Sequence, residues 1–152
     1  MTELLLKSLT KYYTENDNFD NLVMILNDQK KISLRLIDWF VTNYSKKYNT
    51  IFLLKEYNNK ITITEDFNEK IHSQINVYQE YKSQLKAFSK KRFDPFCRRE
   101  RIEYTCNDKS ISTTVGQLNF FRWAIKNHIV EYISKYVEQI EIDMNESLQA
   151  TK

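Results

Sequence analysis

The side chains best suited to chemistry lie in one stretch around the single proline of the chain, Pro95. Residues 82–101 hold eight basic and two acidic residues, a net charge of +6, whereas the rest of the chain carries −3. Lysine is the usual cation, with 17 copies against six arginines, yet four of the six arginines fall within positions 92–101. Because the planar guanidinium group binds phosphate or carboxylate through two hydrogen bonds, this local choice of arginine indicates an anionic partner.

Two phenylalanines, Phe93 and Phe96, lie among these cations. Cations neutralise phosphates, and exposed aromatic rings stack on unpaired bases, so the combination favours recognition of single-stranded nucleic acid. The sequence therefore predicts a non-enzymatic nucleic-acid-binding protein, for DNA or RNA, with no sequence specificity predicted. The predicted contact residues are Lys90, Lys91, Arg92, Phe93, Phe96, Arg98, Arg99, Arg101, Arg122 and Lys126.

The same residues also have structural explanations. Basic residues at the end of a helix complement the helix dipole, and arginines form ion pairs with acidic side chains such as Glu138, Glu141 and Asp143. Phe93 and Phe96 are candidates for buried anchors, since aromatic residues beside a proline often fix a loop to the core. The exposure of the basic side chains decides between these interpretations.

A protein-interaction or assembly module is the alternative function. In it the same arginines bind an acidic protein partner, and the N-terminal helices form a homo-oligomer or subunit contact. Residues 4–9 contain four leucines, and apolar helices outside a core often serve an interface.

Metal binding and catalysis find little support. Cys97, Cys106, His72 and His128 are the only thiol or imidazole groups, and their spacing lacks the close ligand pairs of zinc sites. We expect reduced thiols and no cofactor. No nucleophile elbow, phosphate-binding loop or metalloprotease motif occurs, so the sequence does not indicate an enzyme.

Composition bounds the fold class. The chain has 152 residues, of which 41% are hydrophobic and 28% charged, as in a packed globular protein of one domain. A single glycine and a single proline favour helices over turn-rich β architectures. No apolar run is long enough to span a membrane, so we expect an intracellular protein without membrane contact.

Hydrophobic periodicity predicts the elements. We expect one or two short helices in residues 1–30 and further helices over 33–47, from about 64 to 93, over 115–126, and from 129 onward. Alternating β-branched residues around Asn58 and Asn59, and around residues 107–109, predict two hairpins. The predicted fold is mainly α (α+β), a compact helical single domain with two short β-hairpins. Its predicted parts are an N-terminal helical extension, 1–30, an α-rich core, 31–146, and a flexible tail, 147–152.

Three segments resemble a known family: ISLRLIDWFVTNY at 32–44, FDPFCRRERI at 93–102 and TTVGQLNFFRWAI at 113–125. They are similar to a family of small uncharacterised proteins of giant nucleocytoplasmic large DNA viruses of the mimivirus type, over roughly residues 32–144. The resemblance implies a viral origin, a setting in the host cytoplasm (viral factory) or the virion, and a role in genome handling or expression. It transfers no functional residue.

Overall fold

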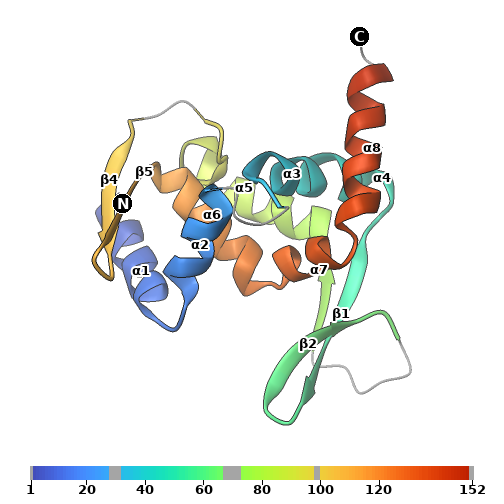
Figure 1. The fold of residues 1–152 in the computed structure, drawn as a ribbon, viewed down its shortest axis with the longest axis horizontal. Helices are drawn as coiled ribbons and strands as arrows, with labels where there is room; N and C mark the ends of the chain where they lie inside the picture. The colour runs from blue at the N-terminus through green and yellow to red at the C-terminus, as the bar shows by residue number, and fades with distance from the viewer. Residues whose placement is uncertain (1, 28–31, 67–72, 98–99, 151–152) are drawn as a thin grey trace. The chain divides into compact units, whose positions relative to one another are not determined.

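The computed structural model describes residues 2–27, 32–66, 73–97 and 100–150 (Figure 1). These residues form helices and two small antiparallel sheets, so the predicted mainly α (α+β) class is confirmed. The chain groups into two compact units, residues 1–34 with 84–124 and residues 35–83 with 125–152. The predicted domain limits stay a prediction, and the grouping adds that the N-terminal residues belong with 84–124.

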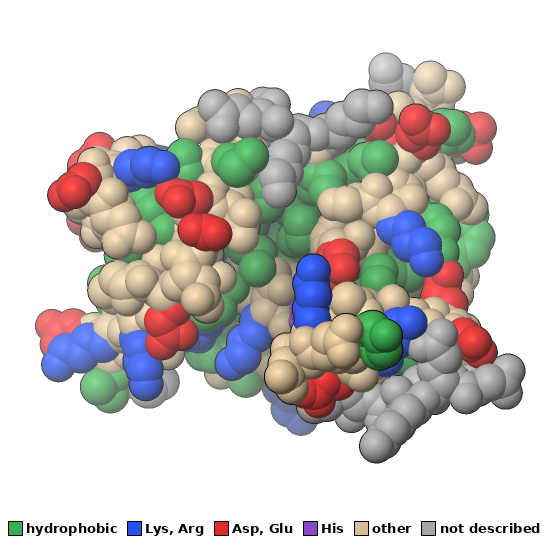
Figure 2. Space-filling view, turned by 60° about the horizontal axis from the view of Figure 1, so that its bottom comes forward, with side chains coloured by type: hydrophobic (Ala, Val, Ile, Leu, Met, Phe, Trp, Pro, Cys, Tyr) green, Lys and Arg blue, Asp and Glu red, His purple; other side chains and the backbone are tan. Residues whose placement is uncertain are grey.

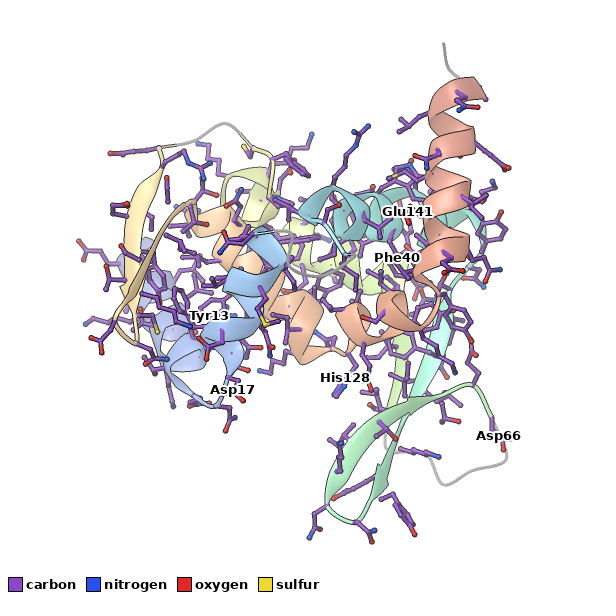
Figure 3. The ribbon with its side chains drawn as sticks, viewed as in Figure 1. Tyr13, Asp17, Phe40, Asp66, His128 and Glu141 are labelled. Carbon is purple, nitrogen blue, oxygen red and sulfur yellow. The ribbon has the colours of Figure 1, made fainter. Side chains whose placement is uncertain are left out.

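The first unit begins with the helical hairpin predicted for the N-terminus. Helix α1(Thr2–Thr14) is followed by α2(Asn18–Leu26), and Asn18 Nδ2 donates a hydrogen bond to the Tyr12 carbonyl at 2.8 Å between the helices. Tyr13 of α1 points into the interior (Figure 3), where its hydroxyl donates to the Leu118 carbonyl at 2.6 Å. A buried aromatic hydroxyl thus joins the N-terminal hairpin to helix α6(Val115–Lys126).

A second hairpin completes this unit. Strands β4(Ile102–Cys106) and β5(Lys109–Thr113) pair antiparallel. Asn107 and Asp108 between them have positive φ angles of 51° and 63°, the left-handed conformation that a two-residue hairpin turn requires. The prediction of a hairpin around residues 107–109 is confirmed.

The second unit combines helices with a three-stranded sheet. The predicted helix over 33–47 is present as α3(Leu34–Trp39), a π-helical turn η1(Phe40–Tyr44) and α4(Ser45–Lys47). Strand β1(Ile51–Tyr57) is central and pairs with β2(Lys60–Thr64) and β3(Ser73–Asn76). Asn58 and Asn59 have φ angles of 52° and 62°, which confirms the predicted hairpin turn.

Two predicted helices differ from the structure. The expected helix from 64 to 93 is helical only from residue 77, as α5(Val77–Phe93), because residues 73–76 pair with β1 as a strand. The stripe residues Phe67 and Ile71 lie outside the described residues. The last helix is interrupted at Tyr136, giving α7(Ile129–Lys135) and α8(Val137–Ala150), so helix continues four residues into the predicted tail.

Both cysteines are free thiols, Cys106 buried and Cys97 partly exposed. Within the described ranges no three His, Cys, Asp or Glu side chains gather as a metal site would require, and His72 falls outside those ranges. Among the described helices, none combines the length and the apolar character needed to cross a bilayer.

Candidate nucleic-acid interface

The basic segment forms a short turn, residues 90–97, which we call the basic turn. Helix α5 breaks at Ser89, whose φ of 66° and ψ of 166° are not helical, and the last helical turn then carries Lys90, Lys91 and Arg92. Cations at a helix C-terminus are stabilised by the helix dipole. The Asp94 carboxylate accepts the Phe96 N–H at 2.9 Å and tightens the turn after the helix.

Uncharged side chains of α6 hold the backbone of the basic turn. Asn119 Nδ2 donates to the Arg92 carbonyl at 2.8 Å, and Gln117 Nε2 donates to the Pro95 carbonyl at 3.2 Å. Both side chains are buried, so these amides satisfy carbonyls that the end of a helix leaves without partners. Helix α6 therefore positions the turn without neutralising its cations.

The single glycine makes this approach possible. A Cβ atom at Gly116 would lie 2.9 Å from the Asp94 carbonyl oxygen and 3.4 Å from the Lys91 carbonyl oxygen. Any side chain would push α6 away from the turn, because the atoms it would meet belong to backbone.

The cations of the segment are open to solvent. Lys90, Lys91 and Arg101 are exposed and Arg92 is partly exposed. No ion pair is seen between these four side chains and the carboxylates of the described residues. Arg101 instead donates to the hydroxyl and carbonyl of Ser112, at 3.0 and 2.7 Å. Arg98 and Arg99 lie outside the described residues.

The two phenylalanines separate into different roles. Phe93 is fully buried, with its ring centroid 5.5 Å from those of Phe120 and Trp123, so the prediction that it stacks on bases is wrong. Its burial is the anchoring role considered as the alternative. Phe96 is 52% exposed beside the cations and remains free to stack on a ligand.

Arg122 acts within the unit. Its guanidinium donates to Ser8 Oγ at 2.6 Å and to Asn119 Oδ1 at 3.0 Å, and partial burial lowers the pKa of Arg122. These bonds tie α1 to α6 and orient the amide that holds the basic turn, and the phosphate contact of Arg122 stays a prediction. Lys126 is exposed and belongs to the second unit.

A groove of about 590 Å³ lies in the first unit beside Arg101. Arg101, Lys109, Ser110, Ser112 and Gln117 supply its polar lining, and Val23, Leu26 and Ile111 supply apolar surface. Lys109 Nζ forms an ion pair with Asp20 Oδ1 at 2.7 Å. We call this cavity the basic groove. Sequence reasoning missed Lys109 and the two serines, because the predicted hairpin does not by itself show which of its side chains line a groove with Val23 and Leu26 of α2.

Charges of both signs occur on the displayed surface. Figure 2 shows basic and acidic side chains of the described residues interspersed on the face that it displays. Along the sequence, concentrated positive charge is a property of the 82–101 segment, since the rest of the chain carries −3.

Fold and site define the class to which the chain belongs, a small mainly helical α+β protein with a solvent-open basic turn. The chain belongs to the family of unknown function DUF7197, which it matches over residues 1–152. The predicted limits of the resemblance, 32–144, are therefore too narrow, because the N-terminal helices are part of the family.

A curated relative places the family among viruses. The chain is 39% identical over 137 residues to "Uncharacterized protein L507" of Acanthamoeba polyphaga mimivirus. The match covers 86% of this chain and 48% of that protein, so the chain spans about half the length of its relative. The predicted resemblance to an uncharacterised giant-virus family is confirmed. No solved structure matches the chain.

Proposed function

We propose that this protein binds nucleic acid without catalysing a reaction, and that Lys90, Lys91, Arg92 and Arg101 contact phosphates. The observation that carries the proposal is the exposure of these cations without a described carboxylate partner. A cation already paired inside its own molecule gains little from a phosphate, whereas an unpaired one releases counterions when it binds.

Phe96 and the basic groove extend this interface. The exposed ring of Phe96 offers a stacking surface for an unpaired base next to the phosphate contacts. The groove beside Arg101 adds two serine hydroxyls, groups that donate hydrogen bonds to phosphate oxygens. We also propose Arg98 and Arg99 as phosphate contacts, on the evidence of the sequence alone. The partner is DNA or RNA, read through its backbone and base faces and not through its sequence.

The family suggests the setting. A relative from a giant virus supports a role in viral genome handling or expression, in the host cytoplasm or the virion. The chain covers 48% of that relative, so any role of the longer protein is carried over to this chain only as a proposal.

Salt-dependent binding tests the proposal. Fluorescence anisotropy with labelled single-stranded and double-stranded DNA and RNA compares the wild type, the pair Lys90→Gln with Lys91→Gln, and the matched pair Lys7→Gln with Lys11→Gln. All four lysines are exposed, so both pairs remove two charges from the same unit. Loss of two phosphate contacts should reduce the slope of log K against log salt by about 2 on duplex DNA.

The control pair should leave that slope close to the wild-type value. Phe96→Ala should weaken single-strand binding by about 1–3 kcal/mol and leave duplex binding nearly unchanged. Equal slopes for the two lysine pairs, or no binding by the wild type at low salt, would reject the interface.

One observation favours the alternative of a protein-interaction module. Of the four leucines at 4–9, Leu5 and Leu9 are buried in the core, and Leu4 is 71% exposed and open to contact with another molecule. Light scattering of the purified protein distinguishes the two functions. A monomer that retains nucleic acid supports the first, and a stable nucleic-acid-free oligomer that Leu4→Ser dissociates supports the second.

A further inference from the structure

A second cavity lies wholly within the second unit. It has a volume of about 330 Å³, and its lining joins the end of the helix formed by α3, η1 and α4 to side chains of α7 and α8. We call it the tyrosine pocket. The polar and aromatic side chains that line it are Tyr44, Tyr48, Asn49, Thr50, Tyr132, Gln139 and Asp143.

Asp143 is the charged group of this lining. Its side chain is 13% exposed, and its Oδ2 atom accepts the Tyr48 hydroxyl at 2.6 Å and the Lys47 ammonium at 3.3 Å. Its Oδ1 atom is buried and has no hydrogen-bond partner among the described residues. A buried carboxylate oxygen without a donor is costly, so Asp143, which lines the cavity, carries negative charge that the groups of this chain satisfy only in part.

Stacked rings fix the walls of the pocket. Tyr44 packs between Phe40 and Tyr48, with ring centroids 5.4 and 4.6 Å apart, and Tyr132 stacks on Phe52 at 4.9 Å. Figure 3 shows Phe40 in the interior of this unit. Burial raises the pKa of Tyr44 and of Tyr132, so both phenols stay uncharged at neutral pH. The walls are therefore rigid, aromatic and neutral around one carboxylate.

These features select for a cation. The Asp143 carboxylate repels an anion, and electron-rich ring faces attract positive charge. Lys47 already illustrates the preference, since its ammonium lies 5.0 Å from the centre of the Tyr48 ring as well as beside Asp143. A bare divalent metal ion is a poor fit, because Mg²⁺ and Ca²⁺ need more oxygen ligands than one carboxylate supplies.

We propose that the tyrosine pocket binds a primary ammonium or guanidinium group, which pairs with the Asp143 carboxylate while its alkyl chain lies against the tyrosine rings. The bound group belongs to a small amine or to a lysine or arginine side chain, which share this chemistry. The site is independent of the basic turn and takes a ligand of the opposite charge.

Titration with agmatine, which carries both groups on a four-carbon chain, tests the proposal. Isothermal calorimetry and the aromatic NMR signals of the full chain should both report one saturable site. Asp143→Asn should lower the affinity at least about tenfold, because a hydrogen bond to a charged group is lost. Glu141→Gln is the matched control, because it removes one negative charge from the exposed side of the same helix (Figure 3). It should bind as the wild type does.

Lys47→Met gives an independent test that does not depend on the folding of the Asp143 variant. Removing the internal cation leaves the full charge of Asp143 to the ligand, so the affinity for agmatine should rise several-fold. A silent titration, unchanged binding by Asp143→Asn, or weaker binding by Lys47→Met would overturn the proposal. Acetyl-arginine-amide binding more tightly than agmatine assigns the site to a protein side chain, and the reverse order assigns it to a free amine.

Discussion

The basic turn and the tyrosine pocket hold charge in opposite ways. In the basic turn, buried amides of Asn119 and Gln117 bind only the backbone, and the cationic side chains point away unpaired. In the tyrosine pocket the charged side chain itself is enclosed, and Tyr48 and Lys47 bind it directly. One region presents its charge to solvent and the other keeps its charge in a cavity.

This difference separates the ligands that each region suits. Exposed cations act through long-range attraction, which salt screens, so the basic turn suits an extended polyanion. An enclosed carboxylate among rings acts at short range in a medium of lower dielectric constant, so the tyrosine pocket suits one compact cation. The first interaction should weaken steeply with salt and the second should not.

Gly116→Ala places a side chain at the closest contact between α6 and the basic turn, and it has the largest expected effect on stability. The added Cβ would lie 2.9 Å from a backbone carbonyl, so the free energy of unfolding should fall by about 1–3 kcal/mol. Urea denaturation measures this loss. Ser134→Ala, an exposed helical site in the second unit, is the control and should change stability little. A more stable Gly116→Ala protein would show that helix propensity outweighs the contact.

Ser89→Gly tests whether the break before the basic turn is strained. With φ at 66° and ψ at 166°, Ser89 adopts a conformation that glycine occupies readily, so the substitution should raise the free energy of unfolding by about 1–2 kcal/mol. Ala87→Gly, two residues earlier in the regular part of α5, should lower it by about 1 kcal/mol. Substitution by glycine should therefore raise the free energy of unfolding at position 89 and lower it at position 87, although both positions are exposed. A lower free energy of unfolding in both variants would show that Ser89 is not strained.

Local sequence rules predicted the elements whose causes are local. The asparagine pair at 58 and 59 and the Asn107–Asp108 pair adopt positive φ as expected for hairpin turns, and periodicity identified α1, α2 and α6. Strand β3 was not predicted, because Ile75 fits the apolar stripe of a helix as well as the pattern of a strand. Only its pairing with Phe52 of β1 decides between the two. Short apolar runs carry both patterns, so a distant partner determines the structure.

The two candidate sites differ in the same respect. A run of cations can be read directly from the sequence, so the basic segment was predicted. The sequence left the burial of Phe93 open, because it depends on packing against α6. The tyrosine pocket has no signal in the sequence, because Tyr48 and Asp143 are 95 positions apart and each is ordinary in its own segment.

Alkaline pH probes the buried tyrosines of the first unit. Burial raises the pKa of Tyr12 to about 12 and that of Tyr13 well above 10, with Arg122 opposing both shifts. Above pH 10 the unfolded chain loses these phenolic protons while the folded chain retains them, so stability is full below pH 10 and falls between pH 10 and 12. Each such group adds up to about 1.4 kcal/mol per pH unit to the fall.

Tyr13→Phe should make that fall shallower, while costing about 1 kcal/mol at neutral pH because the hydrogen bond to the Leu118 carbonyl is lost. Urea denaturation between pH 7 and 11.5 measures both effects. Tyr57→Phe, which changes a tyrosine that is 72% exposed on the β1–β2 hairpin, should follow the wild-type curve. If Tyr13→Phe also follows that curve, burial does not hold Tyr13 protonated, and the alkaline loss of stability arises from Tyr12 and from the tyrosines of the pocket, whose pKa values burial also raises.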